Sequence, residues 1–473
     1  MNKKLGTPIG KMVVGIRRSI GNHHDCSGEK QQQSMYCNKC WQHKLSIDLN
    51  HSKAWHPKHY QQHRNPLYET KTIRIIRADH IETNAKLVIK MIDLDSSSND
   101  DNDDQQQSSM IDVHITEINM MAKLRHPNVI QMLTSFVNDN YLWQIMPMAE
   151  YGSADQWSRP NGLPELTIAL IIKDVLNGLN YLHRKGIIHR AVCGSHILIM
   201  ADGTCVLTGL KYSTNVLQMG RWQTKIHQYP RQATAKLLNF LAPEILEQNL
   251  LGYNSKSDIY SLGIVCCELA NGCIPFEDIV LTEMLLDKLT GNFPRPLDST
   301  CDEIRNFPTD DPDLSIEVKE KYNLYKNRTF SSYFHMFTIE HCLNFDSSLR
   351  PTAVDLLNHQ FIKQTKKCHH HRHHQQQHHH HHHKEKNSSS PLLIEMLKNL
   401  PQNSTSRANN NVIINMNNND NNGDGQKKSI IIDDDNVEQC SNVTTTKIDE
   451  KFKTMALTAD HEKQDTMTID WIF

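Results

Sequence analysis

The sequence predicts an α+β protein in which a strand-rich N-terminal lobe precedes a helical C-terminal lobe. Short runs rich in β-branched residues come first, and long amphipathic helical patterns begin after Gly152. The composition adds a third observation. Only 38% of the 473 residues are hydrophobic, which is typical of one globular domain accompanied by long polar segments.

The N-terminal lobe is expected to contain four strands and one helix. The strands are KTIRIIR within residues 67–77, KLVIKMIDL at 86–94, NVIQMLTSFV at 128–137 and NYLWQIMPM at 140–148. The helix is VHITEINMMAKL at 113–124, which stops before His126-Pro127. A flexible acidic insert is expected between the second strand and this helix.

The C-terminal lobe is expected to be helical. ELTIALIIKDVLNGLNYLHRKG has a long amphipathic pattern that ends at Gly186. The other predicted helices are SDIYSLGIVCCELANG, FSSYFHMFTIEHCL and TAVDLLNHQF, at residues 257–272, 330–343 and 352–361.

Composition divides the chain into four zones. Residues 45–362 form the predicted folded domain, and residues 1–44 an N-terminal extension. Residues 363–465 are a low-complexity linker rich in His, Gln and Asn, and residues 466–473 a short tail. Because polar tracts bury too little apolar surface to offset the entropy of ordering, we expect disorder on both sides of the domain.

Charge and hydropathy exclude several classes of partner. The net charge is −2, so no global field favours nucleic acid or a membrane surface. No run of about 18 apolar residues is present, so we expect no membrane span. The twelve cysteines are scattered, as in a reducing compartment. We expect a cytoplasmic protein, with the nucleus as a second location.

Four motifs in the folded zone are collinear with those of protein kinases. Ile188-His189-Arg190, followed by Ile197-Leu198-Ile199, resembles the catalytic loop, and Ala242-Pro243-Glu244 resembles the motif that closes the activation segment. Asp258 resembles the buried aspartate that organises the catalytic loop, and Arg350 is placed to pair with Glu244. The resemblance implies a bilobal protein-kinase-like fold.

The residues that carry kinase chemistry are replaced at these positions. Phosphoryl transfer needs a carboxylate to orient the substrate hydroxyl and oxygen ligands for Mg²⁺. The positions of the base, the loop lysine and the metal-binding asparagine hold Ala191, Cys193 and His196, and the Asp-Phe-Gly triplet becomes Gly209-Leu210-Lys211. In place of a glycine-rich loop before the strand within 67–77 stands HSKAWHPKHYQQHRNP. We expect no catalytic residue and no bound metal.

Two elements of the nucleotide site remain. Lys90 fits the lysine of the third strand, and Glu117 fits its partner on the helix. Alternatively, Lys90 is only a strand-end lysine in solvent. We expect ATP binding that needs little or no Mg²⁺, with Lys90, Glu117, Lys211 and Lys236 around the phosphates.

Several stretches resemble the STE20-related adaptor pseudokinases, known as STRAD. They are AEYGSADQW, HRAVCGSHILI, VLTGLK, APEILEQNLLGYNSKSDIYSLGIVCCELANGCIPF and RTFSSYFHMF. The resemblance implies an adaptor that activates a serine/threonine kinase of the liver kinase B type, together with an armadillo-like scaffold of the calcium-binding protein 39 type.

The resemblance also implies two partner surfaces. In the family a terminal Trp-Glu-Phe binds the scaffold, and this chain ends in Trp471-Ile472-Phe473, with isoleucine in place of the glutamate. The activation segment meets the client kinase, which points to Tyr229 and Arg231. The alternative is that this segment does not bind a partner and packs against its own C-terminal lobe.

Two other functions stay open, and one metal signal is discounted. The chain could be a weakly active Ste20-like kinase with unusual residues, or a scaffold that never binds nucleotide. Cys37 and Cys40, with His59 and His63 downstream, have the spacing of a zinc site, but 29 histidines produce such spacings by chance. We interpret the His tract as a spacer.

Overall fold

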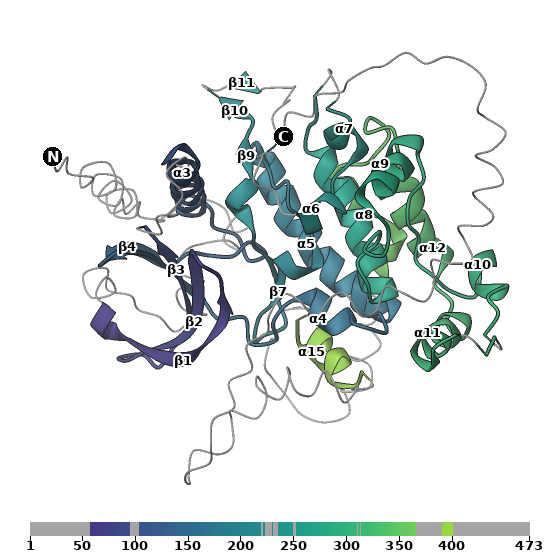
Figure 1. Cartoon of the computed structure of the whole chain (residues 1–473), viewed down its shortest axis with the longest axis horizontal. Coiled ribbons are helices and arrows are strands. Elements are labelled where there is room, and N and C mark those ends of the chain that lie inside the picture. Colours follow the sequence, from purple (N-terminus) through teal and green to yellow (C-terminus); the bar gives the residue numbers. More distant parts are fainter. Residues whose placement is uncertain are drawn as a thin grey trace, which may run out of the picture. The chain divides into compact units, whose positions relative to one another are not determined.

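The computed structural model describes residues 57–94, 104–218, 221–222, 229, 235–248, 252–309, 311–312, 314–365 and 390–400. All of them except 278–280 belong to one compact unit. Within this unit the large sheet and the long helices form separate groups (Figure 1). The predicted bilobal α+β fold is confirmed. The expected extension 1–44 and the tail 466–473 lie outside the described residues.

The N-terminal lobe is an antiparallel sheet of order β1-β2-β3-β5-β4, joined by helix α3. The bounds are β1 Tyr60–Glu69, β2 Ile73–His80, β3 Lys86–Asp93, α3 Asp104–Met121, β4 Thr134–Asn138 and β5 Tyr141–Pro147. Alternating residues of β2 and β3 point into a small core that includes Ile76, Ile89 and Trp143, as the period of a strand requires.

The structure corrects the first hairpin. Most of the segment expected in place of the glycine-rich loop forms a short 3-10 turn, Pro57–His59, and strand β1. The loop between β1 and β2 is the tight turn 70–72, closed by the Thr70 amide donating to the Ile73 carbonyl at 2.8 Å. This connection contains no glycine. Sequence reasoning misplaced it because β1 is polar and almost fully exposed, so it lacks a strand pattern.

Two further N-terminal elements differ from expectation. Helix α3 begins inside the stretch expected to be a flexible insert. The strand expected at 128–137 is regular only from Thr134. Before it, the Ile130 amide donates to the Leu207 carbonyl at 2.9 Å, so this part of the chain is bound to residues of the C-terminal lobe and not to the sheet.

The C-terminal lobe is built around α5, Glu165–Arg184, and α8, Lys256–Asn271. Every residue of α8 from Ser257 to Asn271 is buried. The other helices are α4 Ala154–Ser158, α6 Ala235–Leu238, α7 Pro243–Leu246, α9 Leu281–Thr290, α10 Asp302–Arg305, α11 Ile316–Lys326, α12 Ser332–His335 and α13 Ala353–Leu356. The helix expected at 330–343 is α12 continued by a π-helical segment, Met336–Cys342.

Short paired strands and 3-10 turns follow α5 and precede α6 in the sequence. β6 pairs with β9, β7 with β8 and β10 with β11, all antiparallel. The bounds are β6 Ile187–Ile188, η3 Gly194–His196, β7 Ile197–Ile199, β8 Cys205–Leu207, η4 Leu210–Tyr212, β9 Thr214–Asn215, β10 Leu217–Gln218 and β11 Arg221–Trp222.

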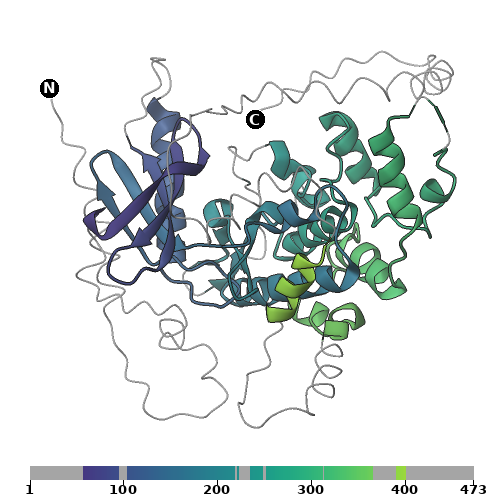
Figure 2. The same ribbon diagram turned by 90° about the horizontal axis from the view of Figure 1, so that it is seen from below.

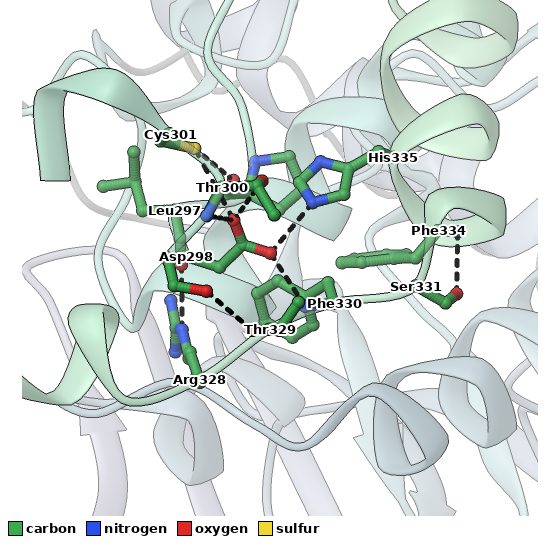
Figure 3. A network of polar contacts seen from close by, with 12 residues as sticks. Leu297, Asp298, Thr300, Cys301, Arg328, Thr329, Phe330, Ser331, Phe334 and His335 are labelled. Atoms are coloured by element: carbon green, nitrogen blue, oxygen red, sulfur yellow. Dashed lines mark hydrogen bonds and ion pairs between the residues drawn. The ribbon is translucent and has the colours of Figure 1, made fainter. Parts of the chain in front are cut away.

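The buried carboxylate of Asp298 anchors the chain before α10 to the chain before α12 (Figure 3). It accepts hydrogen bonds from the Phe330 amide at 2.7 Å, from the Thr300 hydroxyl at 2.5 Å and from His335 Nε2 at 3.0 Å. Because both oxygens of this buried carboxylate accept hydrogen bonds, Asp298 has a structural role: it holds the two segments together.

The expectation of disorder beyond residue 363 is wrong for one segment. Residues Ser390–Lys398 form helix α15, which packs against α5 (Figures 1 and 2). Leu393 and Leu397 are buried in the main core, one helical turn apart. The rest of the expected linker, except 363–365 and 399–400, lies outside the described residues. No helix in the described part is long and apolar enough to cross a membrane.

Candidate functional site

The predicted ion pair between β3 and α3 is present. Lys90 Nζ lies 2.8 Å from Glu117 Oε2, and both side chains are largely buried. His114 Nδ1 lies 3.4 Å from the same oxygen. Burial alone would raise the pKa of Glu117, but Lys90 and His114 outweigh it and lower this pKa to about 2. The Glu117 carboxylate is therefore ionised at neutral pH, and Lys90 is a largely buried partner of this carboxylate and not a strand-end lysine in solvent.

Lys211 lies in the same electrostatic environment. It belongs to η4, and burial together with the nearby charge of Lys90 lowers its pKa, while Glu117 acts in the opposite direction. Glu117 thus pairs with Lys90 and also acts electrostatically on Lys211. This arrangement leaves positive charge available for an anionic ligand.

Asp258 organises the catalytic-loop segment, as its motif predicts. Its two carboxylate oxygens accept the His189 and Arg190 amides, each at 2.8 Å, and His183 Nε2 at 2.8 Å. Arg190 has a φ of 63°, a left-handed conformation that costs energy in a non-glycine residue. The fully buried aspartate stabilises this turn.

The positions at which the sequence predicts the loss of catalytic residues lie together next to this turn. Ala191 is buried and offers no polar side-chain atom. His196 donates from Nδ1 to the Ala191 carbonyl at 2.7 Å, and its ring stands against Gly209. Burial would lower the pKa of His196, but Cys193 and the Ala191 carbonyl outweigh it and raise this pKa to about 9.

These residues do not fit Mg²⁺, the ion that a kinase fold implies. The ion prefers hard oxygen ligands, and the two metal positions hold an imidazole and a glycine. The imidazole occupies the space that a side chain at position 209 would need. Among the described residues no group of three or more His, Cys, Asp or Glu could hold a metal ion. For the discounted zinc signal, His63 instead binds Asp79 at 2.9 Å, and Cys37 and Cys40 lie outside the described residues.

Tyr229 points inward. Its hydroxyl donates to the Arg190 carbonyl at 2.8 Å, and its ring lies 5.7 Å from the Arg190 guanidinium carbon. For this residue the alternative of packing against its own lobe explains the geometry, and a role in partner binding stays a prediction. Arg231, the side chain of Lys236 and the tail residues Trp471, Ile472 and Phe473 lie outside the described residues.

The predicted pair that closes the activation segment is present. Arg350 binds Glu244 with two parallel hydrogen bonds of 2.7 and 2.9 Å. It also donates to the Asn344 carbonyl at 2.6 Å. The bidentate geometry fixes the end of the segment to the C-terminal lobe.

Sequence reasoning missed two buried ionisable residues. Glu268 on α8 accepts the Gly194 amide at 2.9 Å, and burial with the nearby Cys193 and Asp155 raises its pKa to about 8. Lys288 on α9 donates to the Asn239 and Leu241 carbonyls at 2.6 and 2.8 Å. Both stand in helices with apolar patterns. Their roles are visible only in the structure, where each side chain binds backbone groups of a segment distant in sequence.

The fold, the Lys90–Glu117 pair and the loop held by Asp258 are those of a protein kinase domain. A family model described as "Protein kinase domain" matches residues 71–362, and the chain belongs to that family. Within it, the chain belongs with the STE20-related kinase adapter proteins. It is 37% identical to "STE20-related kinase adapter protein alpha" of Rattus norvegicus over 303 residues, which cover 60% of this chain and 74% of the relative.

Two human relatives agree. The identity to the alpha protein of Homo sapiens is 36% over 307 residues, 60% of this chain and 68% of the relative. The identity to the human beta protein is 38% over 267 residues, 51% of this chain and 62% of the relative. The resemblance to STRAD is therefore confirmed.

Proposed function

We propose that this protein is a catalytically inactive adaptor that binds and allosterically activates a serine/threonine kinase of the liver kinase B type. It acts together with an armadillo-like scaffold of the calcium-binding protein 39 type, in the cytoplasm and also in the nucleus. One observation carries the proposal. The Lys90–Glu117 pair keeps the arrangement of an active kinase, while the positions of the base and of the metal ligands hold Ala191, His196 and Gly209.

The adapter names of the relatives support the class of function. A protein that keeps a closed ion pair without chemistry can present one fixed surface to a client. Nucleotide would stabilise the same arrangement by binding the native state only. Lys90 and Lys211 supply positive charge for its phosphates, and Lys236 on α6 is a third candidate.

The alternative is a weakly active Ste20-like kinase, and the intact Lys90–Glu117 pair is the observation that favours it. Incubation with radiolabelled ATP and a generic substrate separates the two. We expect no transfer, and we expect Ala191→Asp alone not to restore it, since two metal positions stay unsuited. Transfer by the wild-type chain that Lys90→Met abolishes would establish the alternative.

The adaptor role itself needs a positive test. The purified chain is mixed with a liver kinase B-type kinase and a calcium-binding protein 39-type scaffold, and the client's activity is measured. We expect several-fold activation that Ala191→Asp leaves unchanged. Absence of binding to either protein would refute the proposed partners. Calorimetry with ATP in EDTA distinguishes a nucleotide-binding adaptor from a scaffold that never binds nucleotide.

A further inference from the structure

Gly209 lies directly against the ring of His196. Its φ of 82° and ψ of 31° place it in the left-handed region at the start of η4. A Cβ added here would lie 2.4 Å from His196 Nδ1 and 2.6 Å from Cγ. Both distances are far below van der Waals contact. No residue except glycine fits at 209 while His196 keeps its place.

His196 is held in that place from several directions. Its Nδ1 donates to the Ala191 carbonyl at 2.7 Å. Its backbone amide donates to the Cys193 carbonyl at 3.0 Å, and its own carbonyl accepts the Thr208 amide at 2.9 Å. Thr208 directly precedes Gly209. The hydrogen bond between Thr208 and His196 therefore holds both the backbone of His196 and the chain that leads into Gly209. Moving the ring would break a buried hydrogen bond.

We propose that His196 and Gly209 form a steric interlock that keeps a carboxylate, and with it a metal ion, out of this cleft. His196 is a positioning residue: its imidazole fills the volume of the missing side chain and supports the turn that carries Lys211. The inference deepens the proposed function, because it rests on a metal-free cleft as part of the adaptor.

The interlock predicts an order in which the two positions can be substituted. A side chain at 209 cannot be accommodated until residue 196 is smaller. Asparagine at 196 alone would leave a void against Gly209, since the ring now fills that space. The two positions should therefore be strongly coupled in stability, whereas glycines of similar backbone conformation elsewhere should not depend on His196.

A double-mutant cycle on the full chain tests the coupling through the melting temperature. Gly291 is the matched control, because its φ is 86° and an added Cβ would meet only Phe345, at 3.9 Å. Gly291→Ala should lower Tm by about 2–6 °C, the effect of backbone strain alone. Gly209→Ala should lower Tm at least about twice as much in the wild type, and about as much as the control in a His196→Ala background.

A second readout separates an interlock from ordinary packing. Gly209→Asp alone should be insoluble or strongly destabilised, and His196→Asn should rescue it. In the rescued double variant, Mg²⁺ should increase the thermal shift caused by ATP, whereas in the wild type Mg²⁺ should add nothing to the shift measured in EDTA.

The proposal is overturned if Gly209→Ala has the same effect with and without the His196 ring, or if Gly209→Asp alone is as stable as wild type. The stability cycle decides this without nucleotide. If ATP stabilises none of the variants while the coupling is present, the nucleotide part of the proposed function fails and the interlock stands.

Discussion

At the scale of single residues, the kinase-like site retains charged side chains, whereas the two positions predicted to bind metal hold no oxygen ligand. Lys90 and Glu117 form an ion pair whose charges act on Lys211, and the positions predicted to hold the base and the metal ligands of a kinase hold Ala191, His196 and Gly209. The charge of Glu117 depends on its contacts with Lys90 and His114, and the space next to Gly209 is filled by the His196 ring. Their effects can therefore be measured one residue at a time.

The Glu117 carboxylate should make stability depend on acid. Its folded-state pKa is about 2, below the ordinary value of 4.5, so its contribution is full above pH 4.5 and is lost as the pH falls toward 2. The shift corresponds to a contribution from Glu117 to the free energy of unfolding on the order of 3 kcal/mol. Urea unfolding between pH 7 and pH 2 should show a steeper loss for wild type than for Glu117→Gln.

The exposed Glu283 on α9 provides the control for this measurement. Glu283→Gln should reproduce the wild-type pH profile. Identical acid profiles for wild type and Glu117→Gln would show that the ion pair with Lys90 adds nothing to folding.

At the scale of elements, helix α15 is an unexpected part of the folded domain. Its sequence, SPLLIEMLK, places leucines one turn apart, and Pro391 stands in its first turn, where its missing amide is not needed. The helix covers the apolar side of α5 near Thr167, whose hydroxyl lies 3.9 Å from the sulfur of Met396. The domain thus extends past a long polar tract.

Truncating the buried face of α15 should destabilise the whole domain. Leu397 is fully buried, so Leu397→Ala should lower the free energy of unfolding by about 2–5 kcal/mol. Differential scanning fluorimetry should show a fall in Tm of at least about 4 °C. The exposed Lys398 gives the control, and Lys398→Ala should leave Tm unchanged. Equal melting of the two variants would show that α15 does not belong to the cooperative unit.

At the scale of the whole molecule, the adaptor combines a folded kinase domain with an apolar tail. Ile469-Asp470-Trp471-Ile472-Phe473 holds two aromatics and two isoleucines, unlike the polar sequence before it. Aromatic anchors on a tether are suited to pockets on a partner. The tail lies outside the described residues, so its role stays a prediction.

A peptide of the last dozen residues should bind the calcium-binding protein 39-type scaffold. Trp471→Ala with Phe473→Ala should weaken this binding at least tenfold, about 1.4 kcal/mol, in a fluorescence polarisation assay. Because Ile472 carries no charge, the affinity should depend less on ionic strength than that of a tail with Glu at this position. The full-length chain should lose less, since a second contact raises the effective concentration.

The matched control is Thr468→Ala in the same peptide, which should bind like wild type. Binding that is indifferent to the loss of both aromatics would make the tail an ordinary polar end.

The sequence alone determined the bilobal fold and the long helices α5 and α8, and it predicts that the catalytic residues are replaced. Periodicity and motif order express local preferences and burial, and both are written along the chain. The pairing partners of Lys90, Asp258 and Arg350 also followed from their motifs.

Only the tertiary structure decided the features that depend on residues distant in sequence. The exposed strand β1 has no apolar alternation, so its pairing with β2 is visible only in space. α15 gains its stability from α5 rather than from its own short sequence. The fit of the His196 ring over Gly209 depends on distances that no pattern encodes, because steric exclusion acts between atoms brought together by folding.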